Sequence, residues 1–211
     1  MSVGILSVKG ICVKFKPMNL YWRGGNCVSI QNQEVELVVD PQDIEKELKS
    51  AKSADVFLLS DKNGSVKIPA KSASFIINTP GEYDTKGFFV MGLHGIVDAV
   101  TYIVESEGIR VCHLPGVKKE LTDEQLETIS DVDILLADIG NNDDSNEIAA
   151  KVINQIEPRI VIPIGYDPAK KQKTFLEEMG ASGNEPQNKF SVKKKDLPQE
   201  ETEVVILNAV K

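Results

Sequence analysis

Residues 54–68, ADVFLLSDKNGSVKI, read as a buried strand that opens into a polar turn. The apolar run 56–59 predicts the strand, and Asn63-Gly64 predicts a sharp turn after it. In α/β proteins the loop at the carboxyl end of a strand is where ligands bind and chemistry occurs. This loop contains Asp, Lys, Asn and Ser but no histidine. A functional site here would have to work without an imidazole from this loop.

Short apolar runs bounded by turn residues predict strands on both sides of this stretch. Asp40-Pro41 predicts the start of a helix between two of them, because Asp is a good N-cap and Pro suits the first helical position. Ser106-Glu107-Gly108 predicts a hairpin turn, and 79–84 predicts another turn with Tyr83 packed beneath it. The predicted strands are 11–15, 27–30, 35–39, 56–59, 75–78, 88–93, 101–105, 109–114, 132–139, 160–164 and 203–207.

Three further helices are predicted in the second half of the chain. Thr122 and Gln125 have the spacing of a capping box. The next helix is expected to be capped by Asp144 or Ser145 and to stop before Pro158. The last spans 169–179 and ends at Gly180, which suits the left-handed cap position. This order of strands and helices predicts a layered α/β or α+β fold.

Charge and composition exclude several functional classes. The chain has 211 residues and a formal net charge of -8, which argues against nucleic-acid binding and against anionic membranes. Three widely spaced cysteines without a CxxC pattern indicate a reducing compartment, so a cytoplasmic location is expected. The basic run 193–195 and the acidic residues Asp131 and Asp133 are interpreted as solvated.

Eight segments, in order, resemble the metallo-β-lactamase superfamily, in its ascorbate-6-phosphate-lactonase-like branch of metal-dependent hydrolases. The likeness runs from about Met18 to Leu207, so 1–211 is interpreted as one domain and 1–17 as an N-terminal extension. The resemblance implies a four-layer αββα sandwich with metals at one edge between the two sheets. The segments are 21–30, 38–41, 55–60, 79–83, 109–114, 121–126, 131–136 and 160–163.

The resemblance also implies a His-x-His-x-Asp-His motif directly after the strand at 56–59. Such a motif holds zinc or manganese, and the metal lowers the pKa of its bound water to about 7. In this sequence the four ligand positions read Asp61, Asn63, Ser65 and Val66. Only Asp61 is a good metal ligand.

The family's remaining ligand positions are also altered. Its Gly-Asp pair after the hairpin, whose Asp bridges two metals, matches Pro115-Gly116, and its late histidine matches Gly165. The loop that carries the middle histidine is short here, and His94 is near it but out of register. No catalytic, cofactor-binding or metal-binding residue is therefore predicted. Asp40, which helps orient the family's metal loop, is interpreted here as a helix cap.

Two functional hypotheses follow. The first is a non-catalytic module, a pseudoenzyme whose vestigial cleft binds a protein partner or a small ligand. The second is a zinc- or manganese-dependent hydrolase of a lactone or a phosphorylated small molecule that uses a rebuilt site. The candidates for a rebuilt site are Asp61, His94, His113 and Asp138. Cys112 and His113 are neighbours on a strand and point to opposite faces, so they are not expected to act together.

Overall fold

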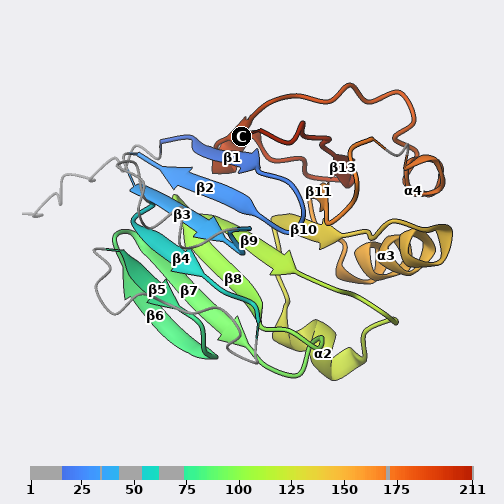
Figure 1. Ribbon diagram of the computed structural model, residues 1–211. Helices are drawn as coiled ribbons and strands as arrows, with labels where there is room; N and C mark the ends of the chain where they lie inside the picture. The colour runs from blue at the N-terminus through green and yellow to red at the C-terminus, as the bar shows by residue number, and fades with distance from the viewer. Residues whose placement is uncertain (1–15, 34, 43–53, 62–73, 170–171, 211) are drawn as a thin grey trace, which may run out of the picture.

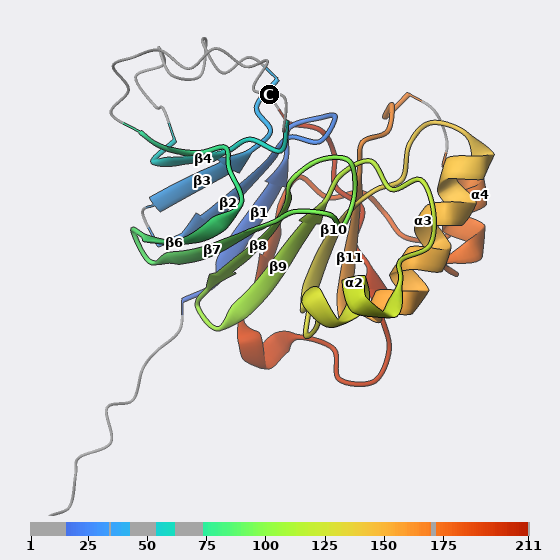
Figure 2. The same ribbon diagram turned by 90° about the horizontal axis from the view of Figure 1, so that it is seen from below.

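The computed structural model describes residues 16–33, 35–42, 54–61, 74–169 and 172–210. Two β-sheets pack face to face, and the helices lie against the outer face of one of them (Figures 1 and 2). This arrangement confirms the predicted metallo-β-lactamase-type sandwich. The segments predicted as a strand at 11–15 and as a helix after Asp40 fall largely outside the described residues.

The first sheet has six strands in the order β12-β1-β2-β3-β4-β5. β3, β4 and β5 run parallel to one another, and the other pairs are antiparallel. The strands are β1 (Met18–Trp22), β2 (Val28–Asn32), β3 (Val35–Val39), β4 (Val56–Leu58), β5 (Phe75–Ile77) and β12 (Phe190–Val192).

The second sheet has seven strands in the order β13-β11-β10-β9-β8-β7-β6. β9, β10, β11 and β13 are parallel, and β6 to β9 form an antiparallel meander. The strands are β6 (Gly81–Thr85), β7 (Phe88–Leu93), β8 (Thr101–Ser106), β9 (Ile109–Leu114), β10 (Ile134–Asp138), β11 (Ile160–Ile164) and β13 (Glu203–Val204). The predicted hairpin of β8 and β9 is confirmed, whereas 81–85, predicted as part of a turn, is an edge strand.

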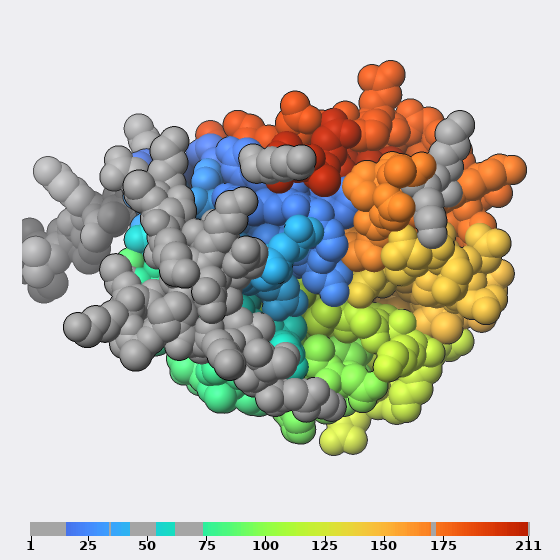
Figure 3. Space-filling model, viewed as in Figure 1, coloured from blue at the N-terminus to red at the C-terminus, as the bar shows by residue number. Residues whose placement is uncertain are grey.

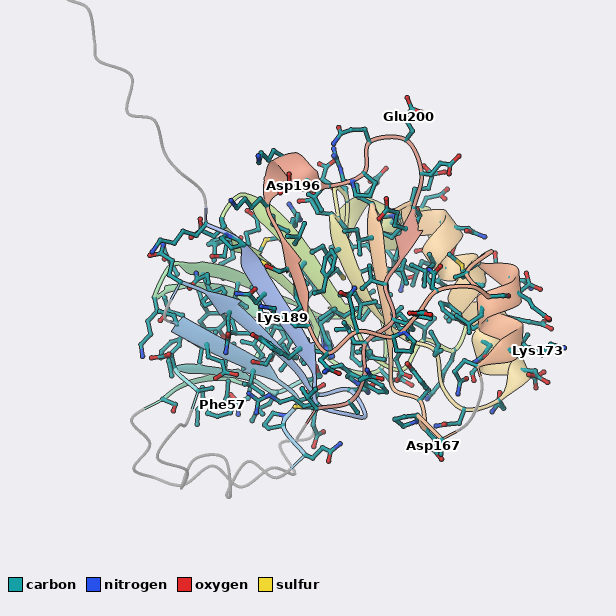
Figure 4. The ribbon with its side chains drawn as sticks, turned by 90° about the horizontal axis from the view of Figure 1, so that it is seen from above. Phe57, Asp167, Lys173, Lys189, Asp196 and Glu200 are labelled. Atoms are coloured by element: carbon teal, nitrogen blue, oxygen red, sulfur yellow. The ribbon has the colours of Figure 1, made fainter. Side chains whose placement is uncertain are left out.

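The main core lies between the sheets. Along β1, Met18, Leu20 and Trp22 are fully buried and alternate with half-buried residues, as expected for a strand with one face on the core. Trp22 stacks on Tyr166 with ring centroids 4.6 Å apart. A second core lies between the seven-stranded sheet and the helices. Phe57 of β4 lies on the other outer face, in a small apolar cluster with Cys27 and Val38 (Figure 4).

The helices are α2 (Asp123–Thr128), α3 (Asp143–Ile156), α4 (Lys173–Glu178) and the short 3-10 helix η1 (Lys194–Asp196). The capping box of Thr122 and Gln125 is confirmed. The cap of α3 is Asn142, which forms a capping box with Ser145, so the predicted caps Asp144 and Ser145 were wrong. None of the helices in the described part of the chain is long and apolar enough to cross a membrane.

Asp133 is buried rather than solvated, so that prediction is wrong. Its carboxylate accepts two 2.7 Å hydrogen bonds from Lys194 Nζ and one of 2.9 Å from the Arg110 amide. Arg159 Nε lies 3.5 Å from the same carboxylate. Lys194, in the basic run at 193–195, therefore pairs with a buried carboxylate and joins η1 to the residue that precedes β10.

Candidate functional site

The carboxyl ends of five strands meet at one edge of the sandwich. β3 and β4 come from the six-stranded sheet, and β9, β10 and β11 from the other. The residues that follow these ends are Asp40, Ser60, Gly116 and Gly165, with Asp138 closing β10. The turn between β1 and β2 adds Asn26. These six residues are called the cleft residues below.

Asp40 orients the start of the loop after β4. Its Oδ1 accepts a 2.7 Å hydrogen bond from the Ser60 amide, and its backbone amide donates to Leu58. Its φ of 45° is left-handed, whereas a helix cap has an extended backbone. The helix that Asp40 is predicted to cap lies outside the described residues, and within them the Asp40 carboxylate reaches across to the end of the next strand.

His113 is 1% exposed and lies at the centre of a small polar group. Its Nε2 is 3.1 Å from the carbonyl oxygen of Asn26, which can only accept, so Nε2 carries a proton. Nδ1 is 3.5 Å from Ser60 Oγ, and Asp40 Oδ2 is 3.9 Å from Nε2. Both ring nitrogens thus have partners within the protein, and both partners are distant in the sequence.

Tyr102 fixes the end of β4 from the opposite sheet. Its hydroxyl is within hydrogen-bonding distance of the carbonyl oxygens of Leu59, at 2.9 Å, and Ile77, at 3.2 Å. Burial raises the pKa of Tyr102, and the nearby Asp40 carboxylate adds to the effect. The loop after β4 therefore begins from a position held by both sheets.

Asp138 joins three turns through its carboxylate. Oδ2 accepts hydrogen bonds from the Gly116 amide at 3.0 Å and from Asn26 Nδ2 at 3.3 Å. Oδ1 accepts from the Gly140 amide at 3.0 Å. Three N–H groups thus stabilise the negative charge of a half-buried carboxylate.

Gly165 lies directly against this carboxylate. A Cβ at this position would be 2.0 Å from Asp138 Oδ1 and 2.7 Å from Asn26 Oδ1. The φ of Gly165 is +75°, a conformation that side chains disfavour. Its amide donates to the carbonyl of Gly25 at 2.9 Å. The position matched to the family's late histidine is therefore filled by a neighbouring carboxylate.

The structure brings together some of the residues singled out in the sequence. Asp61 follows Ser60 at the cleft, and Asn63, Ser65 and Val66 lie outside the described residues. His113, Asp138, Gly116 and Gly165 lie at the cleft, whereas His94 is exposed after β7 and lines a separate cavity. The described part of the chain contains no group of three or more His, Cys, Asp or Glu side chains that could hold a metal.

The cleft residues do not fit the metal centre that the fold family implies. Its bridging carboxylate would stand at Gly116, which has no side chain and points its amide at Asp138. Its late histidine would collide with Asp138. His113 Nε2 is bound to a carbonyl, so the ring presents no lone pair there to a metal. The side chains of Asp40 and Asp138 are likewise directed at protein partners.

Asn26 was missed by the sequence analysis. Asn26, in the turn between β1 and β2, contributes a side-chain donor to Asp138 and a backbone acceptor to His113. Asn26 Oδ1 is buried and lacks a hydrogen-bond partner among the described residues. The hydrogen bond between Asn26 and Asp138 joins residues 112 positions apart, so no local sequence pattern could have predicted the role of this turn.

Comparisons with known proteins agree with this architecture. A crystal structure from Thermotoga maritima, provisionally a zinc-dependent hydrolase of the metallo-β-lactamase superfamily, is 24% identical, with a TM-score of 0.67 over 90% of this chain and 100% of that one. The metallo-β-lactamase fold protein YhfI from Bacillus subtilis is 13% identical, with a TM-score of 0.60 over 90% and 96%. Zinc-bound PqqB from Methylobacterium extorquens is 12% identical, with a TM-score of 0.56 over 79% and 85%.

No curated protein sequence matches the chain significantly. The family model described as "Beta-lactamase superfamily domain" matches residues 19–165, which include all the cleft residues and most strands of both sheets, but not β12 or β13. The chain therefore belongs to the β-lactamase superfamily domain family.

Proposed function

We propose that this protein is a non-catalytic member of its superfamily, a pseudoenzyme that acts through a binding surface. The single observation that carries the proposal is the contact of Asp138 with Gly165. The Asp138 carboxylate, which accepts hydrogen bonds from three N–H groups, occupies the space that the Cβ of a histidine at 165 would need.

The sequence of the loop after β4 supports the same proposal. Val66 has no donor atom, and Asn63 and Ser65 are poor substitutes for His and Asp. A catalytic zinc generally needs three protein ligands and an open position. Asp61 is the one strong ligand left in the motif.

The family reaction needs a metal-bound hydroxide and a positive centre for the developing oxyanion. In the described part of the cleft, the one imidazole is that of His113, which is buried and hydrogen-bonded to the carbonyl oxygen of Asn26. Ser60 Oγ lies near His113 Nδ1, but Ser60 is 3% exposed, so a substrate has no approach to it. Attack by unassisted water on an ester is slower by many orders of magnitude.

The proposal also includes a branch of the superfamily and a cellular location. The motif order resembles that of the ascorbate-6-phosphate-lactonase-like proteins, and the cysteine pattern favours the cytoplasm. The Thermotoga structure, provisionally a zinc-dependent hydrolase, and the zinc-bound PqqB share the fold. We infer an ancestor with a metal centre, from which this chain diverged at 61, 63, 65, 66, 116 and 165.

Hydrolysis assays test the proposal. The purified protein is incubated with a lactone, a phosphodiester and a β-lactam, each with added zinc or manganese. We expect turnover equal to that of metal and buffer alone. Turnover that is lost in Asp61→Ala and retained in the exposed control Asp167→Ala would overturn the proposal and favour a rebuilt hydrolase site.

A further inference from the structure

A cavity of about 490 Å³ opens beside the cleft, between the connection that follows β7 and the segment that leads from β9 into α2. Gly116, one of the cleft residues, also lines this cavity. Pockets for small molecules usually have volumes of about 300–1,000 Å³. Figure 3 shows the yellow-green surface around α2 exposed at the lower edge of one face.

One glutamine holds the two walls of this cavity together. Gln125 Nε2 donates to the carbonyl oxygens of Gly95, at 2.8 Å, and Ile96, at 3.0 Å. Its Oε1 accepts a 2.9 Å hydrogen bond from the Thr122 amide. The second wall is anchored in turn to α3, because the Leu121 amide and carbonyl both bond to the side chain of Gln155. The cavity is thus preformed, and a ligand would not have to order its walls.

The charge of the lining differs from that of the whole chain. The protein has a formal net charge of -8, but the cavity is lined by Lys118, Lys119 and His94, with Asp98 as its one acidic residue. The ion pair of Lys118 with Asp98 is 3.0 Å long, and both side chains are about three-quarters exposed, at 76% and 77%. Exposed pairs contribute little to stability, so Lys118 can turn to an incoming anion at small cost.

The floor of the cavity is apolar. Ile96 and Leu121 are 6% and 7% exposed, and Val97 is half-buried beside them. Lysine ammonium groups bind phosphate or carboxylate as point charges, and an apolar floor favours a hydrocarbon group next to that charge.

We propose that this cavity binds a small organic anion. Its phosphate or carboxylate head contacts Lys118 and Lys119, and its apolar body lies on Ile96, Val97 and Leu121. The inference rests on the proposed function, since it names the class of ligand that a non-catalytic protein of this fold would bind.

The test is a titration of the full chain followed by amide resonances in ¹⁵N-labelled protein. The probes are phenyl phosphate and benzoate, with benzyl alcohol as the neutral probe of the same ring. We expect both anions to shift the resonances of 94–98 and 116–121, with dissociation constants on the order of millimolar for ligands this small. Tighter binding of phenyl phosphate or of benzoate assigns the head group as phosphate or carboxylate.

A matched pair of double variants separates a site from general attraction of anions. Lys118→Glu with Lys119→Glu is compared with Lys173→Glu with Lys189→Glu, which changes the net charge equally. Lys173 resembles Lys118, because it is 79% exposed and paired with a carboxylate, that of Glu177. Both control lysines lie away from the cavity lining (Figure 4). We expect at least a tenfold loss of affinity in the first variant and less than a twofold change in the second.

Equal binding of benzyl alcohol, equal loss in both double variants, or no shift at 94–98 and 116–121 would each overturn the anion site. Release of phenol from phenyl phosphate would instead overturn the proposed lack of catalysis and leave the binding site standing. The two proposals therefore fail separately.

Discussion

Asp138 Oδ1 lies 2.0 Å from the place where a side chain on Gly165 would put its Cβ. The two residues close adjacent parallel strands, β10 and β11, at the edge where the sheets meet. Because that carboxylate also accepts hydrogen bonds from the amides of Gly116 and Gly140, it cannot move aside without breaking them. Glycine at 165 thus fits against Asp138. A histidine at 165 would meet both the unfavourable positive φ and the Asp138 carboxylate.

Restoring a histidine at 165 is expected to destabilise the protein. Gly165→His combines a side chain at positive φ with a collision against Asp138, each of which costs roughly 1–3 kcal/mol. We expect the free energy of unfolding in urea to fall by at least about 2 kcal/mol. Gly183→His is the control, because a Cβ at Gly183 meets nothing within 4 Å. Equal stability of the two variants would contradict the packing described here.

Removing the charge of Asp138 is expected to loosen three turns together. Asp138→Asn keeps the shape but turns an N–H group toward one of the donors that now contact the carboxylate, and loss of such a part-exposed hydrogen bond costs about 0.5–1.5 kcal/mol. We expect a loss of that size in urea unfolding, with faster hydrogen exchange at the amides of Gly116 and Gly140. Unchanged exchange at both amides would show that Asp138 does not hold them.

The buried carboxylate of Asp133 provides a second stability test. Asp133→Asn removes the charge that faces Lys194 and Arg159. Lys194 is 45% exposed, so it can return to water, and the loss should be about 2 kcal/mol rather than the larger cost of an uncompensated buried charge. The control is Asp131→Asn at an exposed, left-handed position that Asn tolerates, where no measurable change is expected.

The stability of the fold is expected to fall at alkaline pH. Burial raises the pKa of Cys112 from 9.0 to about 12, and burial raises that of Tyr166 from 10.0 to about 12. Between about pH 9 and pH 12 the unfolded thiol ionises while the folded thiol keeps its proton, so the folded state binds more protons and loses stability as the pH rises. The slope from Cys112 approaches about 1.4 kcal/mol per pH unit.

Urea unfolding of the wild type and of Cys112→Ala between pH 8.5 and pH 11 measures this contribution. We expect a shallower pH dependence in the variant, whatever its absolute stability. Identical slopes would show that Cys112 ionises as readily in the folded state as in the unfolded one, which is incompatible with its burial.

Much of the fold could be predicted because its signals are local. The apolar runs of β8 and β9 with Glu107-Gly108 between them, and the capping box of Thr122, depend on residues close in sequence. Contacts with distant partners could not be predicted. Asp133 resembles a solvated residue until Lys194, 61 positions later, is placed beside it. The hydrogen bond from the Ser60 amide to Asp40, 20 positions earlier, also has no local signal.

The candidate site also combines features that follow from local sequence with features that depend on distant contacts. The proposal that the family's histidine motif is altered rests on residue identities alone, so it could be made from the sequence. The contacts among Asn26, Asp138 and Gly165 could not be predicted, because these residues come from parts of the chain that are far apart in the sequence. Their contact follows only from the parallel order of the strands, which brings the carboxyl ends of β9, β10 and β11 together.

The central claim is that the cleft holds its shape by protein contacts in place of metal. The most direct measurement is the zinc and manganese content of protein purified without a histidine tag, combined with its melting temperature before and after chelation. We expect far less than one metal ion per chain and an unchanged melting temperature. About one zinc per chain, removed by the chelator with a drop in melting temperature, would contradict the account, because a metal bound to the native state stabilises it by mass action.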